Sequence, residues 1–93
     1  MIRAFADRDT EKVWKRIPVR RWGADVQRTA YRKLLMIDAA EILSDLKVPP
    51  GNRLHALSGS LRELHAVRVN DQYRIVFRFE GEHAFDVRCT DYH

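Results

Sequence analysis

The chain has 93 residues, 45% of them hydrophobic and 32% charged, which is enough apolar material for one folded domain and excludes intrinsic disorder. The 17 basic residues, most of them arginine, outnumber the 13 acidic ones, and the net charge of +4 favours a nucleic acid or an acidic protein as partner. A lone cysteine excludes an internal disulfide, and no apolar run is long enough to span a membrane.

The first half of the chain is predicted to be mostly helical. A short strand is expected at residues 2–5, followed by a short helix with Asp9 and Thr10 at its start and Pro18 after its end. A long helix is predicted over residues 24–47, because apolar residues recur there on two neighbouring stripes, which indicates a helix that packs on more than one side. The first stripe contains Val26, Ala30, Leu34 and Ile37, and the second contains Tyr31, Leu35, Ile42 and Leu46.

After a Pro-Pro-Gly-Asn loop at residues 49–52, the periodicity changes from helical to alternating. Three antiparallel strands are predicted at about residues 67–70, 73–79 and 85–90. The fold class is therefore α+β, with two N-terminal helices packed on one face of a small antiparallel sheet in a single domain of residues 1–93. The covered face is predicted to contain Val67, Val69, Ile75, Phe77, Phe85 and Val87.

The opposite face of the predicted sheet is basic, and we call it the arginine face. Strands would hold its guanidinium groups at fixed spacing, which suits a polyanion. Ion pairs with neighbouring carboxylates are the simpler explanation, but surface pairs contribute little and would not account for so many arginines on one face. The face is predicted to contain Arg68, Arg74, Arg78 and Arg88, with Asp86 among them.

Three consecutive residues after the last strand could carry acid–base chemistry. Asp91, Tyr92 and His93 bring together a carboxylate, a phenol and an imidazole. Histidine exchanges protons near neutral pH, and an aromatic ring can stack on an unpaired base. The alternative explanation is a polar, frayed terminus.

The other candidate side chains have simpler explanations. His55 lies between the loop and the strands, where a local hydrogen bond is the alternative to catalysis. His65 and His83 share no metal-ligand spacing and are expected to be solvated. Cys89 follows the apolar alternation of its strand and is expected in the core, because no local motif would activate its thiol.

Three segments occur in an order that is specific: GNRLHALSG at residues 51–59, VRVNDQYRIVF at residues 67–77 and DYH at residues 91–93. Together they resemble the HigB branch of the RelE toxin superfamily, over nearly the whole chain. The resemblance implies the toxin of a type II toxin–antitoxin system with a fold like that of the microbial ribonucleases. It implies a ribosome-dependent endoribonuclease that cuts mRNA in the A site without a metal or other cofactor.

The resemblance also implies roles for individual residues. Residues 91–93 fall on the terminal motif that relatives use for catalysis, and Arg74 falls on the strand arginine that contacts the scissile phosphate. His55 matches a loop histidine used by some relatives, whereas Ser58 stands where some relatives carry a basic residue. Which carboxylate or imidazole acts as base and which as acid stays open.

The implied partners are a HigA-type helix-turn-helix antitoxin, the ribosomal small subunit and mRNA, with operator DNA bound only through the antitoxin and no membrane. The chain is expected to be cytoplasmic, since no apolar leader segment stands near residue 1. One alternative is a ParE-like toxin that acts on DNA gyrase without catalytic residues, although the terminal Asp-Tyr-His motif argues against it. The other is a non-catalytic RNA- or antitoxin-binding module, for which the arginine face alone would be enough.

Overall fold

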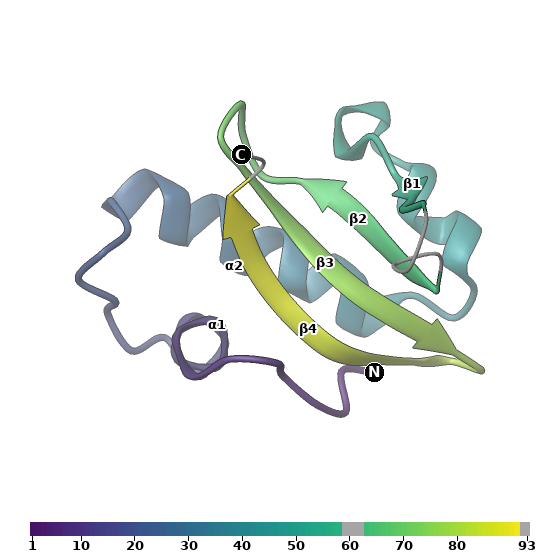
Figure 1. The fold of residues 1–93 in the computed structure, drawn as a ribbon, viewed down its shortest axis with the longest axis horizontal. Coiled ribbons are helices and arrows are strands. Elements are labelled where there is room, and N and C mark those ends of the chain that lie inside the picture. The colour runs from purple at the N-terminus through teal and green to yellow at the C-terminus, as the bar shows by residue number, and fades with distance from the viewer. Residues whose placement is uncertain (59–62, 92–93) are drawn as a thin grey trace.

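The computed structural model describes residues 1–58 and 63–91, in which two α-helices lie on one face of a four-stranded antiparallel sheet (Figure 1). The predicted α+β class, with both helices on the same face, is confirmed. The strands follow the order β1-β2-β3-β4. The elements are α1 (Arg8–Trp14), α2 (Ala24–Ala39), the 3-10 helices η1 (Leu43–Lys47) and η2 (Pro50–Asn52), and the strands β1 (His55–Ala56), β2 (Leu64–Arg68), β3 (Tyr73–Glu80) and β4 (His83–Asp91).

The first helix begins earlier and ends earlier than predicted. Its N-cap is Asp7, whose Oδ1 accepts a hydrogen bond from the backbone nitrogen of Thr10 at 2.7 Å. The helix ends at Trp14 instead of just before Pro18, because Arg16 adopts a left-handed backbone conformation with φ of 64°. The chain therefore leaves the helix one turn before the proline that was expected to stop it.

Thr10 ties α1 to the sheet, since its buried Oγ1 accepts a hydrogen bond from the backbone nitrogen of Cys89 at 2.9 Å. Thr10→Val keeps the shape but leaves this N–H without an acceptor, so we expect the free energy of unfolding to fall by about 1–3 kcal/mol in urea denaturation. Thr10→Ser, which keeps the hydroxyl, is the control. A Thr10→Val protein as stable as the wild type would contradict a stabilising role for this hydrogen bond.

The second helix stops at Ala39, well before the predicted end of the helical pattern. The carboxylate of Asp45 explains the early end, because its Oδ2 accepts hydrogen bonds from the backbone nitrogens of Glu41 at 3.0 Å and Ile42 at 3.2 Å. The chain restarts as η1 and still brings Leu46 into the core. No helix among the described residues is long and apolar enough to cross a membrane.

The core lies between α2 and the sheet. The first predicted stripe of α2 supplies the helical side of this core, and alternate residues of β2, β3 and β4 supply the other side. The side chains that are no more than 1% exposed there include Ala30, Leu34, Ile37, Val67, Ile75, Phe77 and Val87.

One predicted core residue, Phe85, lies on the opposite face of the sheet. Asp86 has φ of 54°, and the pairing of β3 with β4 shifts register at this point, so that β4 carries one extra residue. Phe85 therefore pairs with Arg78 on the arginine face, and its predicted place in the core is wrong. Ala84, which is fully buried, packs in the core instead.

The two edges of the sheet also differ from the prediction. The described residues form four strands instead of three, because the two-residue β1 pairs with β2 at one edge. Such a short strand has no alternation that a sequence pattern could reveal. At the other edge, residues 2–5 form no full strand, although Ile2 and Phe5 make single parallel bridges to β4.

A buried polar pair anchors the loop that leads to β1. Asn52 is fully buried, and its Nδ2 donates to the carbonyl oxygens of Leu46 at 3.1 Å and Val48 at 3.4 Å. Its Oδ1 accepts a hydrogen bond at 2.5 Å from Nζ of Lys33, a buried residue of α2. Burial lowers the pKa of Lys33, and the charges of two nearby arginines lower it further. The start of β1 is thereby tied to α2.

Candidate functional site

The strand register places the four arginines on the sheet face that points away from the helices. Arg68 of β2 pairs directly with Arg74 of β3, and Arg88 of β4 pairs with Val76, two residues further along β3. Like charges directly opposite each other on a sheet destabilise the fold. Two guanidinium groups side by side can together donate to one anion, which favours a binding role for the face.

The four arginines differ in how many ion pairs and ring contacts they already make within the protein. Arg78 is held by Glu80 at 2.7 Å and by Asp86 at 3.3 Å, and its guanidinium lies 4.7 Å from the ring centroid of Phe85. The hydrogen bond to Glu80, together with that to Asp86, raises the pKa of Arg78. Local contacts therefore hold this guanidinium at one end of the face.

Arg68 and Arg88 are more available to a ligand than Arg78. Arg68 forms an ion pair with Asp71, which is fully exposed, so the pair is weakened by water. Arg88 is exposed and has no ion-pair partner among the described residues. Arg74 is half-buried near the start of β3.

The fold brings His55 onto the arginine face. His55 pairs with Ala66 of β2, which in turn pairs with Val76, and Val76 pairs with Arg88. These four residues form one row across the sheet, and the pair of Arg68 and Arg74 lies in the next row. This proximity between a loop histidine and the strand arginines requires the pairing of β1 with β2.

A backbone carbonyl selects the tautomer of His55. Nδ1 of His55 lies 2.8 Å from the carbonyl oxygen of Arg53, which can only accept a hydrogen bond. Arg53 presents this carbonyl from a left-handed conformation with φ of 47°. Nδ1 is therefore the donor, and in the neutral form of this exposed ring Nε2 is the proton acceptor.

Asp91 lies at the end of β4 on the helix side of the sheet, not on the arginine face. It pairs with Tyr73, and the preceding residue, Thr90, pairs with Arg74. Oδ2 of Asp91 accepts a hydrogen bond from Nε2 of Gln72 at 3.1 Å. The predicted partners of Asp91, residues 92–93, lie outside the described residues. Within the described part of the chain, Asp91 is therefore not brought together with His55.

Asp91 does line a cleft of about 410 Å³ that also contains Arg21, Arg88 and Thr90. Arg21 forms an ion pair with Asp9 at 2.8 Å, and its guanidinium lies 4.5 Å from the ring centroid of Trp22. Sequence reasoning missed Arg21 as a site candidate. Its position beside a tryptophan in a basic connector was the available signal.

The remaining candidates have structural roles. Cys89 is buried in the core as predicted, and burial raises the pKa of its thiol to about 12, so it carries no thiolate at neutral pH. His65 and His83 are half-buried, which corrects their expected solvation. Burial lowers the pKa of His65, and nearby His55 lowers it further. Ser58 is exposed just after β1.

The arrangement on the arginine face suits chemistry on a phosphodiester. Guanidinium groups can stabilise the negative charge that develops on phosphate oxygens, and Nε2 of His55 can accept a proton from an attacking hydroxyl. No group of three or more His, Cys, Asp or Glu side chains among the described residues could hold a metal ion.

Comparison with known proteins relates nearly the whole chain to one family. Residues 3–93 match the HigB-like toxin family, described as the RelE-like toxin of type II toxin-antitoxin system HigB. Toxin HigB-1 of Vibrio cholerae serotype O1 is 43% identical over 56 residues, which is 60% of this chain and 59% of that protein. An uncharacterized protein of Haemophilus influenzae is 37% identical over 58 residues, which is 62% of this chain and 57% of that protein. The alignments thus span less than two thirds of either relative.

Solved structures share the fold at low sequence identity. The YoeB-YefM complex from Staphylococcus aureus contains a chain with a TM-score of 0.65 and 15% identity, covering 100% of this chain and 98% of that chain. YafQ from E. coli strain BL21(DE3) has a TM-score of 0.61 and 15% identity, covering 99% of this chain and 92% of that chain. Likeness at this identity shows the fold alone, which is RelE-like.

Proposed function

Since this chain belongs to the HigB-like family of RelE-like toxins of type II toxin–antitoxin systems, we propose that it is a ribosome-dependent endoribonuclease that cuts mRNA in the A site. The observation that carries the proposal is the pairing of β1 with β2, which brings His55 onto the same sheet face as Arg68, Arg74 and Arg88. A gyrase-directed toxin has no need of a proton acceptor beside arginines on one sheet face.

In the proposed reaction, the RNA 2′-hydroxyl attacks the adjacent phosphorus. Nε2 of His55 accepts the hydroxyl proton, because the hydrogen bond of Nδ1 to Arg53 leaves Nε2 as the free acceptor. The new bond joins O2′ to phosphorus, and the bond from phosphorus to O5′ breaks. The products are a 2′,3′-cyclic phosphate and a 5′-hydroxyl, which takes its proton from the terminal motif of residues 91–93.

In the proposed reaction, the arginine face stabilises the negative charge that develops on the phosphate. Arg74 and Arg68 lie directly opposite each other and can together meet the two non-bridging phosphate oxygens. Proton transfer contributes about 10²–10⁴-fold, so most of the rate must come from charge stabilisation and from the position of the RNA. Tyr92 is proposed to stack on an unpaired base of the A-site codon.

The proposed partner in the cell is a HigA-type helix-turn-helix antitoxin that neutralises the toxin and represses the shared operon. A toxin of a toxin–antitoxin system has an antitoxin, and one structure with this fold is a YoeB-YefM complex. The basic surface of the chain suits both mRNA and an acidic protein segment.

The test is controlled expression of the toxin followed by mapping of mRNA ends on translating ribosomes. We expect growth arrest and new 5′ ends within codons, because cleavage requires mRNA in the A site. The His93→Ala protein lacks one proposed proton carrier, so its rate of mRNA cleavage should fall at least about 100-fold. Arrest with intact transcripts and loss of DNA supercoiling would contradict the ribonuclease and support gyrase as the target.

A further inference from the structure

His55 lies at the start of a strand that is too short to hold the side chain by itself. β1 has two residues, and both of them are exposed. Among the described residues, the contact between Nδ1 of His55 and the carbonyl oxygen of Arg53 is the only hydrogen bond of this side chain. The direction of the ring therefore depends on the conformation of the loop that precedes β1.

Arg53 presents its carbonyl from an unusual backbone conformation. Its φ and ψ are both 47°, in the left-handed region that glycine and asparagine adopt more readily than arginine. An extended residue has a ψ of about +135°, which would rotate the carbonyl by roughly 90° from its present direction. The hydrogen bond to His55 therefore requires the left-handed conformation of Arg53.

The residue before Arg53 fixes this turn from inside the protein. Asn52 is fully buried, and its Nδ2 donates to the carbonyl oxygens of Leu46 and Val48. The backbone nitrogen of Arg53 donates to the carbonyl oxygen of Pro50 at 3.1 Å. Such contacts are needed, because an unfavourable backbone conformation persists only where the surrounding structure imposes it.

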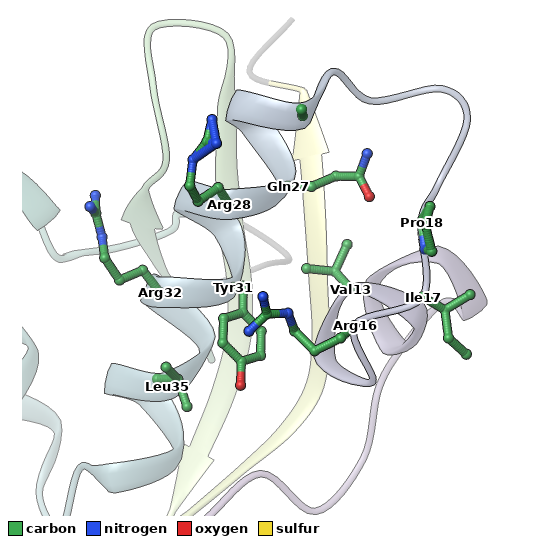
Figure 2. Close-up of a pocket in the computed structure, with 10 residues that line it drawn as sticks. Val13, Arg16, Ile17, Pro18, Gln27, Arg28, Tyr31, Arg32 and Leu35 are labelled. Atoms are coloured by element: carbon green, nitrogen blue, oxygen red, sulfur yellow. The ribbon is translucent and has the colours of Figure 1, made fainter.

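Lys33 of α2 completes this anchor. Its Nζ donates to Oδ1 of Asn52 at 2.5 Å, and the lysine is only 7% exposed. An apolar residue would fill this position without the cost of burying an ammonium group. The adjacent Arg32, by contrast, is exposed and lines a pocket formed by α1, α2 and their connector (Figure 2). Lys33 is therefore the cation of this pair that holds the loop.

We propose that Lys33, Asn52 and Arg53 are positioning residues that hold the ring of His55 with Nδ1 as the donor and Nε2 as the proton acceptor. This inference rests on the proposed function, which makes His55 the base in mRNA cleavage. The contacts run from α2 through Asn52 to the carbonyl of Arg53, so a residue of the helical layer orients a side chain on the opposite face of the sheet. A base that is already oriented needs no further ordering when the RNA binds.

The conformation of Arg53 can be tested apart from its charge. Arg53→Asn and Arg53→Val both remove the guanidinium, but asparagine tolerates the left-handed region, whereas a β-branched residue strongly disfavours it. We expect Arg53→Val to cleave mRNA about 10-fold more slowly than Arg53→Asn, because a misdirected base loses part of its contribution. The measurement is the single-turnover rate on programmed ribosomes with saturating toxin.

A second pair of variants tests the anchor in α2. Lys33→Met removes the donor to Asn52, and we expect the single-turnover rate to fall about 3-fold or more. Arg32→Met is the matched control, because it removes an exposed cation from the adjacent position of the same helix. This control should cleave as the wild type does. If Lys33→Met fails to fold, as judged by circular dichroism, the two Arg53 variants still decide the question.

The orientation of the ring is measured directly by NMR, since the nitrogen chemical shifts of the His55 imidazole distinguish a protonated nitrogen from an unprotonated one. At a pH at which the ring is neutral, the wild type should carry its proton on Nδ1. Arg53→Val and Lys33→Met should populate both tautomers, because the carbonyl of residue 53 is no longer held against the ring. A merely structural anchor would lower the free energy of unfolding and leave the tautomer unchanged.

The outcomes separate this inference from the proposed function. Equal rates and equal tautomers in Arg53→Val and Arg53→Asn would overturn the positioning role, as would a slower rate with an unchanged tautomer. A changed tautomer with an unchanged rate would also overturn it, because the reaction would not use this orientation. If His55→Ala cleaves as the wild type does, the positioning role fails and the ribonuclease stands. If the wild type cuts no mRNA but the tautomer changes in both variants, the ribonuclease fails and the hold on the His55 ring stands.

Discussion

Replacing Arg74 by methionine is expected to lower the rate of ribosome-dependent mRNA cleavage by about 10²–10³-fold, the loss typical of removing one donor to a developing oxyanion. Methionine keeps an apolar stem at this position near the start of β3, where Arg74 is half-buried, so the sheet should stay folded. The measurement is the single-turnover rate on programmed ribosomes with saturating toxin, because this rate reports transition-state stabilisation apart from binding.

Two further substitutions make the Arg74 result specific. Arg74→Lys keeps the charge but loses the bidentate fork, so its rate should lie between those of Arg74→Met and the wild type. Arg78→Met should lower the cleavage rate less than Arg74→Met does, since Glu80 and Asp86 already hold the Arg78 guanidinium. Arg3→Met, at an exposed position outside the arginine face, is the neutral control. Wild-type cleavage by Arg74→Met would remove this arginine from the mechanism.

The sequence pattern predicted the sheet well wherever residues alternate without interruption. β2 and β3 pair in unbroken register, so the predicted faces of Val67, Ile75 and Phe77 were correct. The prediction failed for Phe85, because the backbone at Asp86 takes a positive φ and reverses the alternation. A bulge of this kind depends on pairing with the neighbouring strand, which no local pattern records.

The candidate site shows the same division between local and long-range information. The arginine face follows from alternation alone, but the position of His55 beside it depends on the pairing of His55 with Ala66. The helix-side position of Asp91 could have been predicted, because Asp91 stands two residues after Cys89, which was assigned to the core.

Replacing Asn52 by alanine is expected to lower the free energy of unfolding by about 3 kcal/mol. The substitution removes the acceptor of the buried Lys33 ammonium and the donors to the carbonyl oxygens of Leu46 and Val48. Urea denaturation measures the loss. If Asn52 and Lys33 act as a unit, Asn52→Ala should lower the free energy of unfolding less in a Lys33→Met background than in the wild type. A double-mutant cycle measures the coupling energy between the two residues.

The pH dependence of stability separates the Lys33 charge from simple loss of packing. A lysine whose folded pKa lies below its ordinary 10.5 destabilises the fold while charged, because the unfolded chain binds the proton more tightly. This penalty is fully present below the folded pKa and disappears as the pH rises toward 10.5. Removing Asn52 should lower the folded pKa of Lys33 further, since the ammonium loses its acceptor.

Asn52→Ala should therefore regain more stability than the wild type when the pH is raised from about 7 to about 9.5. The Lys33→Met protein is the matched control, and in that background Asn52→Ala should show no additional gain, because no lysine remains to lose its proton. If Asn52→Ala and the wild type gain the same stability, the destabilisation comes from the lost hydrogen bonds to the loop backbone and not from the Lys33 charge without its acceptor.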